Sequence, residues 1–214
     1  MPWKEVAPAH VVSLARAQSL FRAPQCRLFA VRYQDLLDRA GGHIPQKDGL
    51  DLTGLAPLLP DMALVTVIRP DRCVIRLAGE RLKQRLGFNP VRRNYLDLVP
   101  AWRRPSAMQA MCSVVDGPAG FRAELSYRYS DGVVRETETL ALPLAASRRD
   151  VDGYVLLIDR AVSGEDLASP PVGQVREATL RRRHLIDLGF GLDRSFVDRM
   201  PLAQDGIPAG APNL

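Results

Sequence analysis

The chain has 214 residues, of which 46% are hydrophobic and 25% are charged, and its formal net charge is +5. These values are typical of a globular protein that buries a core without disulfides or metals, and they exclude a disordered chain. No apolar run approaches the length that spans a bilayer, and the first 22 residues lack the continuous apolar segment of a secretion signal. Cys26, Cys73 and Cys112 form no CxxC pair, so we expect a cytoplasmic protein with neither a disulfide framework nor a zinc site.

The first part of the chain is expected to be helical. Apolar residues at helical spacing predict an amphipathic helix from about Ala9 to Arg22 and a second helix from about Arg27 to Arg39. The pair Gly41-Gly42 ends the second helix, because glycine permits a positive φ. Asp51 is placed to cap a short helix that runs to Leu59.

Two strands and a group of helices come next. The apolar run from Met62 to Ile68 is typical of a buried strand, and Cys73 to Ala78 predicts a second strand that forms a hairpin with it. Gly79 breaks this second strand. The pattern then predicts short helices over 80–86 and 95–98, and a longer helix over about 104–115.

Strict alternation of apolar and polar residues is the clearest local pattern. Between Phe121 and Tyr129 it predicts a strand with one buried face and one wet face. Asp131-Gly132 is a strong hairpin turn, so we expect a return strand from Val133 to Leu144. Glu136 and Glu138 in the return strand lie opposite a strand that offers Arg122 and Arg128, and cross-strand ion pairs of this kind on the wet face would each contribute about 0.2–1 kcal/mol.

A last strand and an extension complete the chain. The strand from Gly153 to Asp159 is apolar on both faces, so we expect it to lie centrally in the sheet. Strands joined by hairpins, with helices grouped between them, predict an α+β domain. Beyond Val162 we expect a linker at Ser169-Pro170-Pro171, a helix from Thr179 to Leu188 and a disordered tail from residue 205. The predicted units are a helical extension over 1–26, a domain over 27–162 and a C-terminal extension over 163–214, partly helical and then disordered.

Short motifs follow one another in a fixed order between Arg32 and Arg160. They are Gly41-Gly42, Pro45, Asp51-Leu52, Leu59-Pro60, Arg76-Leu77-Ala78-Gly79, Gly87, Tyr95-Leu96-Asp97-Leu98, Asp131-Gly132 and Leu142-Pro143-Leu144. This ordered set resembles a family of short proteobacterial PAS-like proteins, although Gln46-Lys47 stands where that family usually has arginine. The resemblance implies a PAS-like five-stranded antiparallel sheet with helices on one face, in a stand-alone signalling module.

The resemblance also implies a ligand pocket between the sheet and the intervening helices. The candidate lining residues are Leu64, Ile75, Leu82, Tyr95, Met108, Met111, Cys112, Phe121, Leu125, Leu140 and Leu157. The same residues fit an ordinary core, because apolar side chains at such spacings fill cores more often than they line cavities. Arg76 is a candidate either to clamp a carboxylate or phosphate, or to brace the fold by pairing with Asp97 or capping a helix.

The sequence contains no recognisable catalytic motif, and its cofactor is unknown. GxSxG, HExxH, a phosphate-binding glycine loop and a neighbouring Cys–His pair are all missing, so we do not expect an enzyme. Haem held by histidine is disfavoured, because His10, His43 and His184 lie outside the expected pocket wall. The Asn-Cys-Arg stretch typical of flavin photoreceptors is missing between Gly79 and Leu98.

The N-terminal and C-terminal extensions each suggest a kind of binding partner. An apolar stripe of Val11, Leu14, Leu20 and Phe21 favours a homodimer through the N-terminal helix, although without a partner the stripe would fold back on the sheet. The run Arg181-Arg182-Arg183-His184 offers contacts to nucleic acid phosphates, but the surrounding acidic residues favour a solvated helix face. The sequence therefore predicts a bacterial sensor or adaptor that binds a small ligand or a protein partner. The alternatives are an orphan enzyme or ligand carrier on the same fold, or a nucleic-acid-binding regulator.

Overall fold

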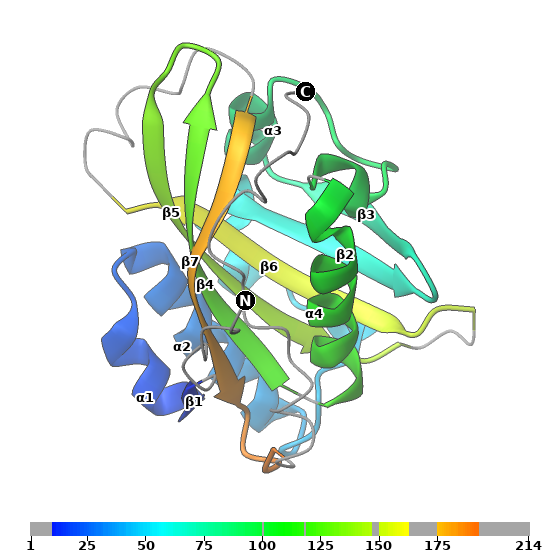
Figure 1. Cartoon of the computed structure of the whole chain (residues 1–214). Helices are drawn as coiled ribbons and strands as arrows, with labels where there is room; N and C mark the ends of the chain where they lie inside the picture. Colours follow the sequence, from blue (N-terminus) through cyan, green and yellow to red (C-terminus); the bar gives the residue numbers. More distant parts are fainter. Residues whose placement is uncertain (1–9, 100, 118, 147–149, 163–174, 193–214) are drawn as a thin grey trace, which may run out of the picture.

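Seven strands form one sheet in the computed structural model of the chain, which describes residues 10–99, 101–117, 119–146, 150–162 and 175–192. The strands are β1 (His10–Ser13), β2 (Met62–Ile68), β3 (Arg72–Ala78), β4 (Ala119–Tyr129), β5 (Val134–Leu144), β6 (Gly153–Ala161) and β7 (Val175–Asp187). Their order in the sheet is β1-β7-β4-β5-β6-β2-β3 (Figure 1). Neighbouring strands are antiparallel, except that β1 runs parallel to β7. The predicted five strands are present, and β1 and β7 extend the sheet beyond them.

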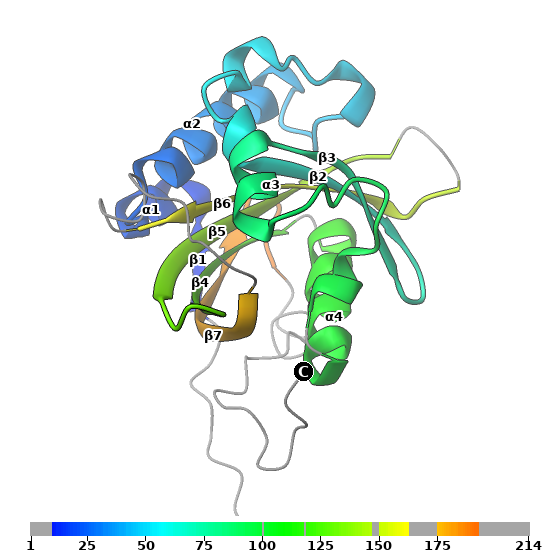
Figure 2. The ribbon, with the colours of Figure 1, turned by 90° about the horizontal axis from the view of Figure 1, so that it is seen from above.

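Helices cover both faces of the sheet, so the prediction of helices on one face is wrong. Among the described residues the α-helices are α1 (Leu14–Ala17), α2 (Pro24–Arg39), α3 (Glu80–Leu86) and α4 (Arg104–Asp116). Figure 2 shows α1 and α2 on one side of the sheet and α3 and α4 on the other. Short 3₁₀ turns lie at Gln18–Leu20, Lys47–Gly49, Thr53–Leu55, Leu59–Asp61, Tyr95–Leu98 and Ala101–Arg103. In the part of the chain described here, no helix is both long and apolar enough to cross a membrane.

The sheet has two separate cores because its central strands are apolar on both faces. In β6, Val155 and Leu157 pack toward α4, whereas Leu156 and Ile158 pack toward α2. Alternate residues of a strand point to opposite faces, so one apolar run supplies both layers. β6 lies between β5 and β2, which confirms its predicted central position.

The elements predicted between residues 24 and 161 are largely confirmed. β2 and α3 have the predicted bounds, and α2, α4 and the other strands of this part differ from prediction by no more than three residues at either end. Gly87 ends α3 with a φ of 76°, as a helix-terminating glycine should. The short helix predicted from Asp51 to Leu59 is instead two 3₁₀ turns, although Asp51 does accept a hydrogen bond from the Thr53 backbone N–H at 2.9 Å.

The N-terminal helix predicted up to Arg22 is wrong over most of its length. Residues 10–13 form β1, and α1 is a single turn. Leu14 and Phe21, from the stripe expected to form a dimer, are buried in the core beside α2. This half of the stripe has therefore folded back on its own chain, whereas Val11 is exposed and Leu20 is half-buried, and a homodimer remains a prediction.

The helix predicted from Thr179 to Leu188 is also wrong, because this segment belongs to β7. β7 pairs with β4 from Ala119 to Tyr129, the full length of that strand. Its period of two is hidden in the sequence, since Arg183 and His184 occupy positions that point into the protein. The predicted linker at 169–171 and the tail from residue 205 lie outside the described residues.

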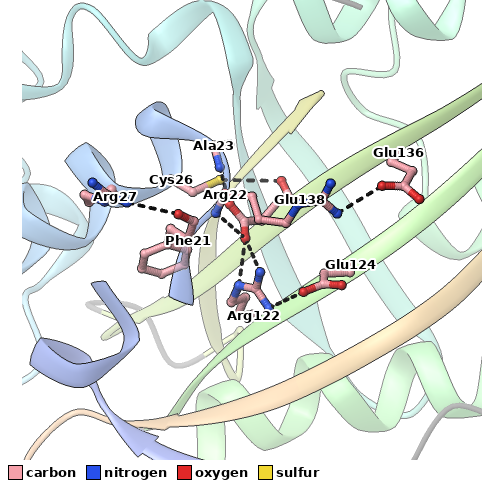
Figure 3. Close-up of polar contacts among 9 residues, drawn as sticks. All are labelled: Phe21, Arg22, Ala23, Cys26, Arg27, Arg122, Glu124, Glu136 and Glu138. Atoms are coloured by element: carbon pink, nitrogen blue, oxygen red, sulfur yellow. Dashed lines mark hydrogen bonds and ion pairs between the residues drawn. The ribbon is translucent and has the colours of Figure 1, made fainter. Parts of the chain in front are cut away.

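Around Arg122, the face of β4 that was predicted to be wet is covered by the segment that leads into α2. Arg122 and Glu138 have side-chain exposures of 2% and 0%, and Arg122 Nε donates to Glu138 Oε1 at 2.7 Å (Figure 3). Glu138 also accepts hydrogen bonds from the backbone N–H groups of Arg22 and Ala23, at 3.2 and 2.9 Å. Ala23 is the N-cap residue of α2 and has no side-chain acceptor, so Glu138 caps this helix from the sheet.

Candidate functional site

A cavity of about 150 Å³ lies between the sheet and the segment that carries α3 and α4. All strands from β2 to β7 contribute to its wall. The lining residues are Ala63, Val65, Ile75, Leu82, Arg85, Leu86, Pro90, Tyr95, Leu98, Val99, Arg103, Ala107, Ala110, Met111, Phe121, Ala123, Leu125, Tyr127, Tyr129, Thr139, Leu157, Asp159, Leu180 and Arg183. An apolar cavity of roughly this volume is enough to bind benzene, so the space fits a molecule with one ring.

The space exists because small side chains stand where a packed core would carry large ones. Arg103, Ala107, Ala110 and Met111 share the face of α4 that looks onto the cavity, at spacings of four, seven and eight residues. Ala123 in the middle of β4 faces them from the sheet. The side chain of alanine is a single methyl group, so at these positions neither α4 nor the sheet fills the space between them.

A row of residues in register crosses the sheet under the cavity. Arg183 in β7 is paired with Ala123 in β4, Ala123 with Thr139 in β5, and Thr139 with Asp159 in β6. Neighbouring strands are about 4.8 Å apart, so the backbones of Arg183 and Asp159 are separated by about 14 Å. The row therefore places a basic and an acidic side chain at opposite sides of the cavity, with two small residues between them.

Arg85, Tyr127, Tyr129 and Asp159 form a polar cluster at the acidic side. Arg85 Nη2 lies 2.9 Å from Asp159 Oδ2, and Arg85 Nη1 donates to the backbone oxygen of Asp159 at 3.2 Å. The Tyr127 hydroxyl donates to Asp159 Oδ2 at 3.4 Å. Burial, together with the nearby Asp159 carboxylate, raises the pKa of Tyr127 well above its usual value of 10.0, so this hydroxyl keeps its proton at neutral pH.

Two atoms of the polar cluster are buried without a hydrogen-bond partner among the described residues. They are Asp159 Oδ1 and the Tyr129 hydroxyl. Both residues line the cavity, and both are more than nine-tenths buried. Buried polar atoms in proteins nearly always have a partner, so these two atoms mark a wall that is incomplete without a further polar group.

Arg103 and Arg183 form the basic side of the cavity. Arg103 is buried at the N-cap position of α4, and the Arg183 guanidinium lies 5.4 Å from the centre of the Phe121 ring. Burial, together with the like charge of Arg103, lowers the pKa of Arg183 to about 10. Arg183 therefore still carries its charge at neutral pH, and this side of the cavity is positive.

Seven of the twelve predicted site residues line the cavity. They are Ile75, Leu82, Tyr95, Met111, Phe121, Leu125 and Leu157. The other five lie elsewhere: Leu64, Arg76, Met108, Cys112 and Leu140 are outside the lining.

The positions of four of these five residues have simple physical explanations. Leu64 and Leu140 are one residue out of step, so they point into the core beside α2. Arg76 is exposed on β3, where its Nε donates to Thr66 Oγ1 at 2.9 Å. Met108 lies beside the cavity on α4, with its sulfur 3.4 Å from the sulfur of Cys73.

The polar residues of the cavity wall were missed by the sequence analysis. Asp159 and the two tyrosines were detectable, because Asp159 shares a strand face with Leu157, and Tyr127 and Tyr129 share one with Phe121. Arg183 was not detectable once its segment had been predicted as helix. Arg85 has a weaker signal, since it lies three residues after Leu82 on α3.

The basic run from Arg181 to His184 is divided between the surface and the interior. Arg181 and Arg182 are exposed, whereas Arg183 is half-buried and His184 is buried. The run is therefore not a continuous basic surface, and nucleic acid binding remains the less favoured alternative. Across the residues that the structure describes, no group of three or more His, Cys, Asp or Glu side chains is arranged to hold a metal ion.

Several solved structures are similar to this chain at low sequence identity. VqmA bound to DPO is 14% identical, with 53% of this chain and 57% of that chain covered and a TM-score of 0.39. The PAS domain of an HTR-like protein from Haloarcula marismortui is 16% identical, with 50% and 88% covered and a TM-score of 0.33. A fungal LOV domain photoreceptor is 18% identical, with 62% and 92% covered and a TM-score of 0.37. The match spans a little over half the length of the VqmA chain.

The family assignment comes from the sequence of the chain itself. A search of the curated proteins finds no match. The family model of the PAS domain matches residues 24–155, which include α2, α3, α4 and the strands from β2 into β6. This match extends over more than half of the chain. The chain therefore belongs to the PAS domain family.

Proposed function

We propose that the chain is a sensory or adaptor module of bacterial signalling, whose cavity binds a small ligand and whose bound state is read by a protein partner. The observation that carries this proposal is a ring-sized cavity with charged side chains in its wall. Burying charges is unfavourable in a region that serves only as core, because apolar side chains of the same volume would fill it at no such cost. A binding site has a use for both the space and the charges.

The two faces of β4 and β5 offer a route from the cavity to the rest of the molecule. Ala123 and Thr139 line the cavity, while their neighbours Arg122 and Glu138 hold the start of α2 on the opposite face (Figure 3). A ligand that favours one arrangement of these strands would shift the position of the segment before α2. Such a population shift requires that the ligand bind the two arrangements with different affinities.

Native mass spectrometry of gently purified chain, with an absorption spectrum of the same sample, tests the proposal. We expect a retained adduct of defined mass in the wild-type chain. The variant Ala123→Leu fills the cavity from its floor and should lose the adduct. Ala15→Leu is the matched control, because Ala15 is exposed on α1. An adduct that survives Ala123→Leu would place the ligand outside the cavity and contradict the proposal.

A further inference from the structure

The polar cluster carries information on the chemistry of the ligand. Asp159 is 8% exposed and Tyr129 is 1% exposed, and both line the cavity. Asp159 Oδ2 is already occupied by Arg85 and Tyr127, whereas Asp159 Oδ1 and the Tyr129 hydroxyl have no partner within the described ranges. The two unsatisfied atoms belong to neighbouring residues of the cluster, since Tyr129 follows Tyr127 along the same face of β4 and the Tyr127 hydroxyl lies 3.4 Å from Asp159 Oδ2.

The hydrogen-bonding capacities of these two atoms are complementary to one functional group. A carboxylate oxygen only accepts hydrogen bonds, whereas a tyrosine hydroxyl both donates and accepts. A hydroxyl group has one donor and two acceptor sites, so it is able to donate to the carboxylate and accept from the tyrosine at the same time. Leaving both atoms unsatisfied would cost the desolvation of each, so a ligand that pairs with them gains affinity.

We propose that the cavity takes a largely apolar molecule of about one ring that carries a hydroxyl group, whose O–H donates to Asp159 Oδ1 and whose oxygen accepts from the Tyr129 hydroxyl. This inference rests on the proposed function, because it concerns the occupant of the same cavity. The apolar part of the ligand lies against the leucine, valine and alanine side chains of the wall, and the hydroxyl gives it orientation.

Other polar groups fit the acidic side of the cavity less well. A cationic amine is disfavoured, because Arg85, Arg103 and Arg183 line the cavity against one aspartate. A carboxylate has no proton to donate and would be repelled by Asp159. An ether or ketone would leave Asp159 Oδ1 unsatisfied, since neither carries a donor.

Phenol and toluene are the two probes, because they have nearly the same shape and differ in the hydroxyl. Their dissociation constants are measured by NMR titration of the full chain. Replacing the ion pair in the double variant Arg85→Met/Asp159→Leu removes the acceptor without leaving either partner buried alone. We expect the preference for phenol over toluene to fall by about tenfold or more in this variant, as for the loss of a hydrogen bond to a charged group. Tyr129→Phe should weaken phenol binding and leave toluene binding unchanged.

The control and the outcomes separate this inference from the proposed function. Tyr33→Phe removes a buried hydroxyl on the opposite face of the sheet, where it donates to the backbone oxygen of Pro143 at 2.6 Å, and should change neither dissociation constant. If both probes bind and neither cavity variant alters their ratio, the hydroxyl inference is overturned and the cavity remains a binding site. If neither probe binds the wild-type chain, the proposed function fails together with the inference. Should the double variant not fold, Tyr129→Phe decides alone, since its hydroxyl has no partner to lose in the described structure.

Discussion

Glu138 is a buried carboxylate that binds two kinds of donor at once. The Arg122 guanidinium neutralises its charge from β4, and the backbone N–H groups of Arg22 and Ala23 reach it from the start of α2. A buried ion pair contributes little net stability over apolar residues of similar shape, yet removing one partner leaves an uncompensated charge. Losing one member of the pair therefore destabilises the fold, although replacing both members by apolar residues would cost little.

The variant Glu138→Ala is expected to lower the free energy of unfolding by about 3–5 kcal/mol, because the buried Arg122 guanidinium keeps only Glu124 as a partner and the backbone N–H groups of Arg22 and Ala23 lose their acceptor. The measurement is urea denaturation followed by circular dichroism. The double variant Arg122→Met/Glu138→Leu should recover most of the loss, since it removes both charges. A double variant that is no more stable than Glu138→Ala would mean that the lost helix cap, which the two variants share, dominates the energy.

Gly79 joins β3 to α3 at a point where two backbone segments touch. Its N–H donates to the Met62 backbone oxygen at 2.8 Å. A Cβ atom at this position would lie 2.0 Å from the Leu59 backbone oxygen and 2.3 Å from that of Pro60. The sequence analysis treated Gly79 only as a strand breaker, but its role is to let α3 begin against the 3₁₀ turn at Leu59–Asp61.

Gly79→Ala is therefore expected to destabilise the chain by more than about 2 kcal/mol, because backbone atoms rather than a flexible side chain stand in the way. Thermal unfolding of the variant measures this loss. Gly54→Ala is the matched control, since a Cβ there meets no atom within 4 Å, and it should change stability by no more than about 1 kcal/mol. Equal effects of the two substitutions would contradict the packing argument.

β7 completes both the sheet and the cavity, although the family match ends before it. It pairs with the whole outer edge of β4 and contributes Leu180 and Arg183 to the cavity wall. A chain that ends after Val162 leaves this edge of β4 open, and exposed strand edges promote association. We expect the shortened chain to form concentration-dependent aggregates in sedimentation velocity, whereas a chain that ends after Leu192 should behave like the full-length protein. A monodisperse, fully folded chain 1–162 would show that β7 is dispensable.

The sequence predicted elements well where the periodicity was supplied by apolar residues, and poorly where charges pointed inward. The alternation in β4 predicted the strand correctly, but it also predicted that Arg122 is exposed to solvent, whereas Arg122 is buried. Nothing in the local sequence indicates that another segment covers Arg122. In β7, Arg183 and His184 interrupt the pattern, so the strand was taken for a helix. The cavity itself depends on the small size of Ala110 and Ala123. The sequence does not show whether the space beside such alanines is filled by other side chains, so the cavity could not be predicted.

The molecule as a whole buries many weak acids that hold their protons. Burial raises the pKa of each thiol and of four tyrosine hydroxyls; for Cys73 it rises from 9.0 to about 12. The groups concerned are Cys26, Cys73, Cys112, Tyr33, Tyr95, Tyr127 and Tyr129. Above their ordinary values of 9.0 and 10.0 the unfolded chain loses these protons while the folded chain keeps them, so folding becomes less favourable as the pH rises.

We expect the free energy of unfolding to fall steadily between pH 8.5 and 11. Arg183 acts in the opposite direction, because its lowered pKa means that the folded chain loses that proton first, but it is one group against seven. Urea titrations at a series of pH values, with a reductant present to keep the thiols free, measure the slope. A stability that is constant or rises over this range would show that these groups are already exposed in the folded chain.

β4 and β7 pair in the sheet but are far apart in the sequence, so they are synthesised at different times. β4 ends at Tyr129 and β7 begins at Val175, so at about 5–20 residues per second the ribosome releases the first strand a few seconds before its partner exists. During those seconds the nascent chain presents an unpaired strand edge to its neighbours on the polysome, and its cavity wall lacks Leu180 and Arg183. Synonymous codons that slow translation between the two strands should therefore lower the soluble yield without altering a single residue of the finished molecule.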